Sequence, residues 1–292
     1  MFTGVYTALV TPFRNGKLDE ASFKDLVERQ VKAGVDGIVP VGTTGESPTV
    51  DFEEHVRIIE LAVFYARDRV KVMAGTGANS TVEAVHLTKS AEYAGADSSL
   101  QVCPYYNKPS QEGLYAHFST IAKSTNLPLC LYSIPGRCNI EIAVDTVTRL
   151  AADCPNIKAI KEAGGTPERV NQLRSALGKR IFILSGDDSM TLPFMSVGAS
   201  GVISVASNII PKQMVRMVHG FLKGDARSAL KLHEKFYPVF KDLFLETNPV
   251  PVKAAAAMLG FCREEYRLPL VKMSPDNRKQ LRATLKSLGI IK

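Results

Sequence analysis

The chain has 292 residues, of which 45% are hydrophobic and 22% charged, a composition typical of a globular protein with a large core. The formal net charge is +7, but lysines and arginines are spread along the chain without a basic block, which argues against nucleic-acid binding and for a solvated cationic surface. The five cysteines show no CxxC spacing, so we expect reduced thiols of a cytoplasmic protein rather than disulfides or a zinc site.

Residues 1–20 lack the apolar stretch of a signal peptide, and no later run is long enough to span a membrane. Short apolar runs typical of strands then alternate with longer segments whose apolar residues recur three and four positions apart. We expect eight strands, at 5–10, 37–42, 70–75, 98–103, 127–133, 157–162, 180–186 and 201–205. The clearest helical periodicity covers 21–33, 52–66 and 81–94.

Several predicted helices end in glycine just before a strand, as at Gly34 and Gly95, where a left-handed C-cap is expected. Right-handed crossovers between eight parallel strands close into a (β/α)8 barrel, which we predict for residues 1–224. An open doubly wound sheet is the alternative, but no GxGxxG motif follows the first strand. Residues 225–292 are predicted to form a helical extension packed on the barrel.

In such barrels the active site lies at the C-terminal ends of the strands. The chemically active side chains and turn residues expected at these ends are Thr43, Thr44, Glu46, Tyr105, Tyr106, Tyr132, Arg137, Lys161, Gly186, Asp187 and Asp188. This set contains no histidine, and its two aspartates have no further ligands beside them. The pattern therefore supports neither metal-dependent hydrolysis nor a Ser–His–Asp triad.

Lys161 ends an apolar strand, although burying an ammonium group is costly. Strand alternation places Ile157, Ala159 and Lys161 on one face, so the lysine is expected to point into the barrel mouth. Desolvation favours the neutral amine, which attacks a ketone to form an imine and then a nucleophilic enamine. The structural alternative is an ion pair with Glu162 or Asp187.

Three neighbouring features fit this chemistry. Tyr132 lies on the preceding strand, where its hydroxyl could carry the protons of carbinolamine formation and dehydration. The turn "GTTGE" offers hydroxyls and backbone N–H groups to a carboxylate, and Arg137 offers a second carboxylate a planar fork. Taken singly these would be a core tyrosine, a helix-capping turn and a surface arginine. Together with Lys161 they predict a Schiff-base site.

The motifs "GTTGES", "PYYNKPSQEGLYAHF", "LYSIPGR", "IKEA" and "SGDD" resemble those of the dihydrodipicolinate synthase family in order and spacing. The resemblance extends from "FTGVYTALVTPF" to "NPVPVKAAAAMLG", nearly the whole chain. It implies a lyase that condenses pyruvate with L-aspartate 4-semialdehyde to 4-hydroxy-tetrahydrodipicolinate, the first committed step of diaminopimelate and lysine biosynthesis. It also implies a cytoplasmic homotetramer, a dimer of dimers, that uses no metal or organic cofactor.

The resemblance assigns roles to individual residues. Lys161 forms the Schiff base with pyruvate, and Thr44 holds the pyruvate carboxylate. Tyr132, Thr43 and Tyr106 form a proton relay, in which Tyr106 reaches into the site of the neighbouring subunit.

Arg137 receives the carboxylate of the semialdehyde by the same resemblance, while the backbone at Gly186 and Ile203 lines the pocket. Related lyases of the superfamily cleave keto-sugar acids such as N-acetylneuraminate and typically lack this arginine, so they are the main alternative. A barrel that binds a ligand without catalysis is the third interpretation, and the lysine, tyrosine and threonine set argues against it.

In feedback-inhibited members of the family, lysine binds at a subunit interface. The matching positions in this chain are Ser47, His55, Asn79, Glu83 and Tyr105, where Glu83 would pair with the ammonium group of the lysine ligand. The alternative is that His55 and Glu83 are ordinary polar residues on helix faces.

Overall fold

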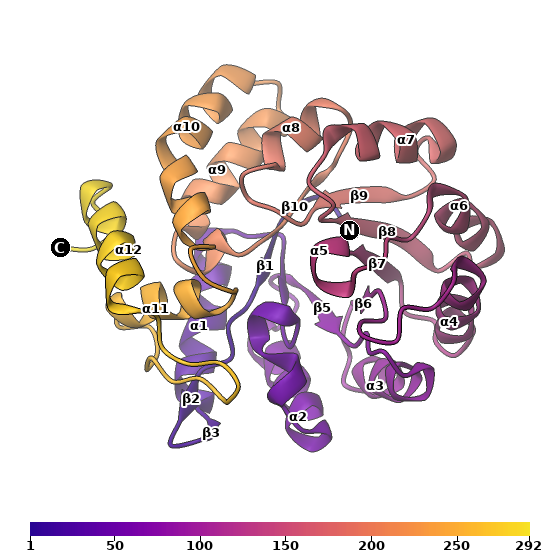
Figure 1. Ribbon diagram of the computed structural model, residues 1–292, viewed down its shortest axis with the longest axis horizontal. Coiled ribbons are helices and arrows are strands. Elements are labelled where there is room, and N and C mark those ends of the chain that lie inside the picture. Colours follow the sequence, from indigo (N-terminus) through magenta and orange to yellow (C-terminus); the bar gives the residue numbers. More distant parts are fainter.

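The computed structural model describes all 292 residues and shows a closed barrel of eight parallel strands surrounded by helices (Figure 1). Barrel strands that are consecutive in the sequence are neighbours in the barrel, and β1 closes it by pairing with both β4 and β10. The barrel strands are β1 (Gly4–Ala8), β4 (Gly37–Val39), β5 (Lys71–Gly75), β6 (Ser98–Val102), β7 (Leu129–Ser133), β8 (Ile157–Glu162), β9 (Phe182–Ser185) and β10 (Gly201–Ser204). The predicted (β/α)8 barrel is confirmed, and the open sheet is excluded.

Eight helices cover the outside of the barrel (Figure 1). They are α1 (Glu20–Ala33), α2 (Phe52–Ala66), α3 (Thr81–Tyr93), α4 (Gln111–Lys123), α6 (Val144–Asp153), α7 (Pro167–Leu177), α8 (Thr191–Ser196) and α9 (Pro211–Leu222). Local sequence signals account for their ends: Asp51, Ser80 and Ser110 each accept a hydrogen bond from a backbone N–H in the first turn, and Gly34 adopts the left-handed C-cap at φ 77°.

Short elements in the loops were not predicted. They are the hairpin β2 (Phe13–Arg14) and β3 (Lys17–Leu18), the 3-10 turns η1 (Thr43–Gly45), η2 (Ser47–Thr49) and η3 (Ala206–Asn208), and the single helical turn α5 (Pro135–Cys138). Three of them, η1, η3 and α5, directly follow the C-terminal ends of barrel strands. These short turns therefore decide where the side chains of the strand ends point.

The apolar residues form two separate layers. The larger lies between strands and helices, and the smaller, of 11 residues, fills the barrel interior. The interior residues are Phe2, Tyr6, Ala8, Val39, Met73, Leu100, Cys130, Tyr132, Ala159, Leu184 and Ile203. Side chains from every strand contribute, so the barrel is a packed core rather than a pore.

Strand β8 contains one irregularity. Leu129 pairs with Ile157, but the next residue, Cys130, pairs with Ala159, which leaves Lys158 as an extra residue. Ile157 therefore belongs to the outer apolar layer, whereas Ala159 belongs to the interior. The predicted placement of Ile157 on the same face as Lys161 is wrong because this bulge interrupts strict alternation.

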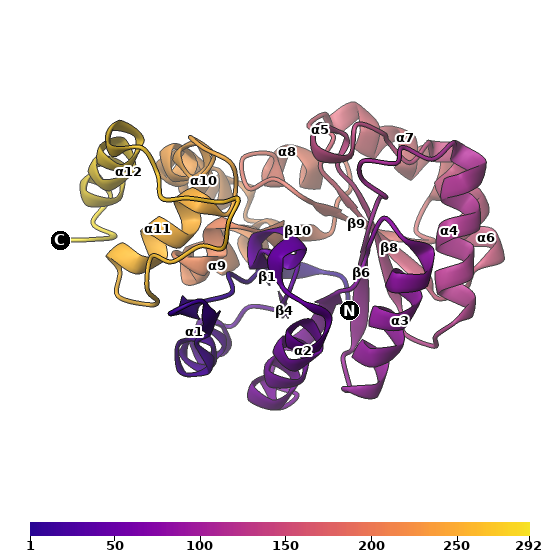
Figure 2. The same ribbon diagram turned by 60° about the horizontal axis from the view of Figure 1, so that its bottom comes forward.

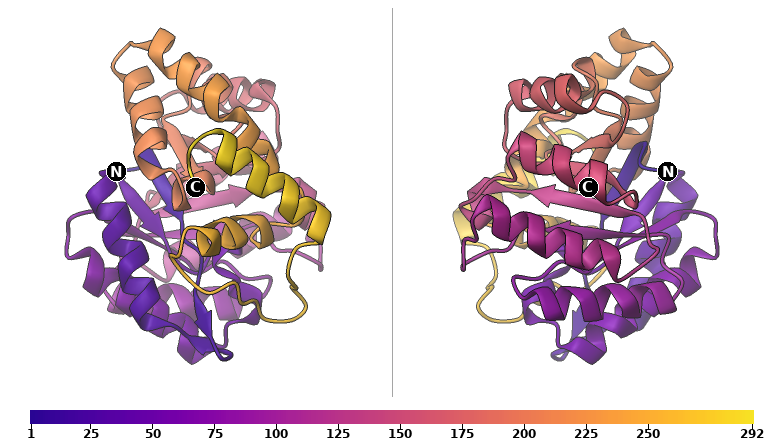
Figure 3. Two further views of the ribbon diagram at one scale, coloured as in Figure 1. Left: turned by 90° about the vertical axis from the view of Figure 1, so that its left-hand side faces the viewer. Right: turned by 90° about the vertical axis from the view of Figure 1, so that its right-hand side faces the viewer.

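The C-terminal part of the chain forms helices α10 (Ala226–Asp242), α11 (Val250–Met258) and α12 (Pro275–Ser287). Helix α10 packs on α9, and α12 packs on both α10 and α11, at one side of the barrel (Figures 2 and 3). The predicted boundary between residues 224 and 225 falls in the turn between α9 and α10. All five cysteines are free, as expected, and none of the helices has the length and apolar character that crossing a membrane requires.

His117 on α4 is a buried histidine that should make the stability of the fold depend on pH. It is buried, its Nδ1 lies 2.9 Å from Thr81 Oγ1, and its Nε2 has no hydrogen-bond partner. Burial lowers the pKa of His117 from 6.5 to about 4. Since the unfolded chain takes up this proton at a higher pH than the folded chain, the free energy of unfolding should fall as pH drops through this interval, by up to about 3 kcal/mol.

Chemical denaturation at several pH values measures this effect, with His117→Asn as the comparison. The variant should lose part of the pH dependence seen in the wild type. Identical pH profiles for the two proteins would contradict the prediction.

Candidate active site

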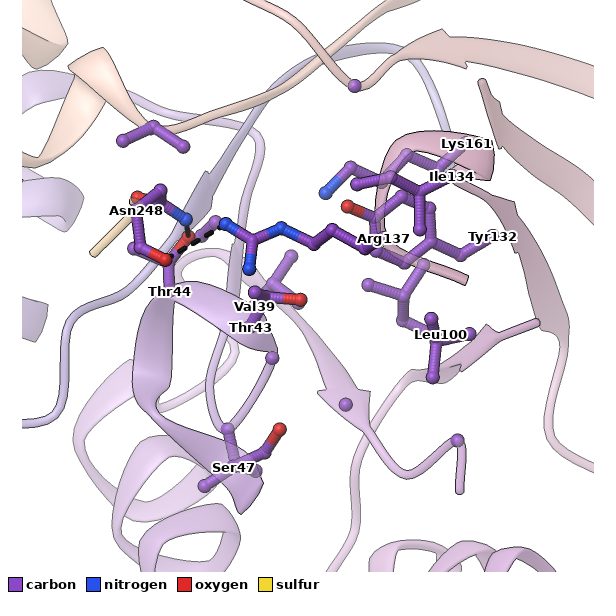
Figure 4. Close-up of a pocket in the computed structure, with 18 of the residues that line it drawn as sticks. Val39, Thr43, Thr44, Ser47, Leu100, Tyr132, Ile134, Arg137, Lys161 and Asn248 are labelled. Atoms are coloured by element: carbon purple, nitrogen blue, oxygen red, sulfur yellow. Dashed lines mark hydrogen bonds between the residues drawn. The ribbon is translucent and has the colours of Figure 1, made fainter. Parts of the chain in front are cut away.

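A cavity opens where the C-terminal ends of the barrel strands converge (Figure 4). Its walls come from the ends of all eight strands, from turns η1 and α5, and from the segment just before α11. The predicted site residues that line it are Thr43, Thr44, Ser47, Tyr132, Arg137, Lys161 and Gly186. Barrel closure thus brings together side chains that are more than a hundred residues apart in the chain.

Lys161 lies near the end of β8 and pairs in register with Tyr132 of β7. The residue is only 6% exposed, and its Nζ is 4.0 Å from the centroid of the Tyr132 ring. Neither acidic neighbour pairs with it: Glu162 lies 3.4 Å from Arg169, and Asp187 accepts a hydrogen bond from a serine. The ion-pair alternative is excluded, so the amine faces the cavity without a counter-ion.

Gly186 determines how much room this amine has. A Cβ atom at this position would lie 3.1 Å from Lys161 Cε and 2.7 Å from Ala163 Cβ, closer than van der Waals contact. The side chain of Ile203, whose backbone was expected to line the pocket, lies in the apolar interior of the barrel, and Val205, two residues further on, lines the cavity.

The turn that carries Thr44 is held by the C-terminal segment. Asn248 Nδ2 donates a hydrogen bond to Thr44 Oγ1 at 3.0 Å (Figure 4). Because this oxygen already accepts from Asn248, the Thr44 hydroxyl proton is left to bind an anionic group in the cavity. Asn248 was not predicted as a site residue. The only feature of the sequence that points to it is its position at the start of the motif "NPVPVKAAAAMLG".

Arg137 contacts the same asparagine. Its Nη2 donates to the backbone oxygen of Asn248 at 3.0 Å, and the guanidinium extends across the cavity mouth between Thr44 and Tyr132 (Figure 4). One residue therefore connects both groups that were predicted to bind carboxylates. Phe244, from the same C-terminal segment, also lines the cavity.

Tyr106 does not join this site within the chain. It is 92% exposed, has a left-handed backbone at φ 72°, and does not line the cavity. The neighbouring Tyr105 is only 36% exposed, and its carbonyl accepts a hydrogen bond from Asn79 Nδ2 at 3.2 Å. The two adjacent tyrosines thus have different environments.

The predicted regulatory residues divide into three groups. Ser47 lines the active-site cavity itself. His55 is buried, its Nε2 lies 2.7 Å from a backbone carbonyl of β5, and burial lowers its pKa. Asn79, Glu83 and Tyr105 lie near one another, and burial together with the Glu83 charge raises the pKa of Tyr105.

A buried, unpaired lysine at the mouth of a (β/α)8 barrel, with a phenol on the adjacent strand and two groups suited to carboxylates, defines a lyase of the Schiff-base aldolase class. A sequence model of the Dihydrodipicolinate synthetase family matches residues 1–288, and the chain belongs to this family.

Individual relatives agree with this assignment. The 4-hydroxy-tetrahydrodipicolinate synthase of Aquifex aeolicus is 50% identical over 290 residues, which cover 99% of either chain. The solved structure of the synthase from Methylacidiphilum fumariolicum is 53% identical, with a TM-score of 0.98 over 99% of this chain and 96% of that chain. The chloride-inhibited dihydrodipicolinate synthase from Acinetobacter baumannii, solved in complex with pyruvate, is 43% identical with a TM-score of 0.96 over 100% of both chains.

The space beside Lys161 can be tested with Gly186→Ala. The added methyl group would force Lys161 away from its observed position, and misplacement by about 1 Å can cost roughly 100-fold in rate. We expect kcat/KM to fall by about 10- to 100-fold, together with a lower melting temperature because Ala163 must also shift. Gly220→Ala is the control, because a Cβ there meets nothing closer than 3.9 Å. Equal activity of the two variants would contradict the prediction.

Proposed function

We propose that this protein is a 4-hydroxy-tetrahydrodipicolinate synthase, which condenses pyruvate with L-aspartate 4-semialdehyde. The observation that carries the proposal is the buried Lys161 amine, 4.0 Å from the Tyr132 ring and without a counter-ion. Relatives about 50% identical over the full chain carry the synthase name, which favours this function over cleavage of a keto-sugar acid. A related enzyme solved with pyruvate supports the choice of first substrate.

The geometry supports a Schiff-base mechanism. Thr44 holds the pyruvate carboxylate, and the neutral amine of Lys161 attacks the ketone carbon to give a carbinolamine. Tyr132 and Thr43 pass protons so that the hydroxyl leaves as water and the imine forms. Loss of a methyl proton then gives the enamine, whose terminal carbon attacks the aldehyde of the second substrate.

Arg137 binds the carboxylate of that second substrate. Its guanidinium lines the same cavity as Lys161 and can form a two-point ion pair with a carboxylate bound there (Figure 4). The amino group of the semialdehyde attacks the imine carbon, closes the ring and releases Lys161 as a free amine. This sequence returns the enzyme to its starting state without an external oxidant or reductant.

We also assign Tyr106 to the site of a second subunit. A phenol that is 92% exposed on one chain, on a strained left-handed backbone, is explained if a partner buries it. The proton relay is then complete only in an oligomer of at least two subunits, and we propose a dimer of dimers located in the cytoplasm.

Covalent trapping tests the central step. Borohydride reduction in the presence of pyruvate should add one reduced pyruvate to Lys161, detectable by peptide mass spectrometry, because reduction of the imine fixes the substrate to Nζ as a stable secondary amine. Lys161→Ala should give no adduct and lose at least about 1,000-fold of the activity in a coupled assay with both substrates.

Arg137→Leu serves as the matched variant for the second substrate. It should still trap pyruvate but lose condensation with the semialdehyde. A wild-type protein that forms no adduct, or that prefers N-acetylneuraminate, would refute the proposed function.

Feedback control by lysine is the remaining part of the proposal. Glu83 lies near Asn79 and Tyr105, which are joined by a hydrogen bond from the Asn79 amide to the Tyr105 carbonyl oxygen. Together the three residues form a polar cluster that suits an amino acid. Millimolar lysine should lower the wild-type rate, and Glu83→Gln should raise the concentration required by at least about tenfold. Glu60→Gln, an exposed carboxylate on α2, is the control. An unchanged wild-type rate would reject lysine binding here.

A further inference from the structure

One ion pair of the chain is completely buried. The Glu46 carboxylate, at the end of the threonine turn η1, contacts the Lys253 ammonium of α11, and both side chains are 0% exposed. The two residues are 207 positions apart in the chain. Burying two charges is costly, and such a pair persists only where further contacts compensate for the lost hydration.

Those further contacts are present. Lys253 Nζ also donates to the backbone oxygen of Glu265 at 2.9 Å and lies 4.3 Å from the centroid of the Phe13 ring. The second carboxylate oxygen of Glu46 accepts the backbone N–H of Arg267 at 3.2 Å. Phe13 from the N-terminal part of the chain, and Glu265 and Arg267 from the C-terminal part, thus contact the ion pair.

Arg267 extends the same network. Its guanidinium lies 4.2 Å from the Phe13 ring centroid and donates to the backbone oxygens of Thr49 and Gly16, at 2.9 Å and 2.8 Å. It also forms a two-point ion pair with Glu54, at the start of α2. The segment after the threonine turn is therefore tied to the loop between α11 and α12.

The turn itself is short and depends on these contacts. The Glu46 N–H donates to the Thr43 oxygen at 3.1 Å, and Thr11 Oγ1 donates to the Gly45 oxygen at 2.7 Å. Glu46 adopts the left-handed backbone at φ 57°, an uncommon conformation for a residue with a side chain. Neither Glu46 nor Lys253 lines the cavity.

We propose that Glu46 and Lys253 are positioning residues for the reaction at Lys161. Their buried ion pair fixes the threonine turn to α11 and so sets the distance from the Thr43 and Thr44 hydroxyls to the lysine on the opposite wall. This inference rests on the proposed Schiff-base function. It gives the C-terminal helices a role in the chemistry, although they supply no group that reacts.

Glu46→Gln tests the proposal, because it removes the charge and retains the shape. The rate of imine trapping with pyruvate should fall by about 10- to 100-fold, the cost of a small misplacement. Hydrogen exchange, followed by mass spectrometry, should become faster in residues 43–49 and stay unchanged in α4.

Asp36→Asn is the control for a general loss of stability. Asp36 accepts hydrogen bonds from the Val5 N–H and from His219, both at 2.7 Å, at the other end of the barrel. This variant should melt earlier but trap pyruvate at the wild-type rate. A wild-type trapping rate in Glu46→Gln, or an equal loss in Asp36→Asn, would overturn the proposal.

The double variant Glu46→Gln, Lys253→Met separates positioning from stability. It leaves no unpaired charge, so it should recover melting temperature but not the trapping rate. Recovery of both would show that the charges are not needed for positioning and would overturn the inference. If the wild type itself trapped no pyruvate, the proposed function would fail, and hydrogen exchange in residues 43–49 would still decide the role of the pair.

Discussion

The site depends on an amine that is buried without a counter-ion. Lys161 stands near the end of β8 and is only 6% exposed, its Nζ lies 4.0 Å from the centroid of the Tyr132 ring, and no carboxylate is paired to it. No carboxylate forms an ion pair with Nζ, and the side chain lines the cavity, where a bound substrate can reach the amine. The nearby acidic residues are engaged elsewhere, since Glu162 lies against Arg169 and Asp188 accepts hydrogen bonds from Ser204 and the backbone that follows it.

The second wall of the cavity is built from a distant part of the chain. Asn248 contacts Thr44 through its amide and Arg137 through its backbone oxygen, so both groups that we propose to bind carboxylates are held by the same residue. The helices after residue 225 are therefore more than a cover for the barrel. They hold the threonine turn in place, while the barrel strands hold the lysine and tyrosine.

The barrel and the buried lysine near the end of β8 were predictable because their signals are local. Each strand is a short apolar run, and a lysine at the end of such a run is unusual enough to be noticed. The contacts of Asn248 and Lys253 could not be predicted from the sequence pattern. Their partners, Thr44 and Glu46, lie 204 and 207 residues away, and a hydrophobic pattern does not show which distant segment a side chain contacts. Tyr106 is a different case, because a single chain offers it no partner to contact.

The bulge in β8 was also beyond prediction, since strict alternation is the rule that it breaks. It has a consequence for how the strand tolerates change in length. Loss of the solvent-facing Lys158 would restore regular pairing with β7 and leave Ala159 and Lys161 directed inward. A one-residue deletion, which would invert an ordinary strand, is at this position compatible with an unchanged orientation of the Lys161 side chain.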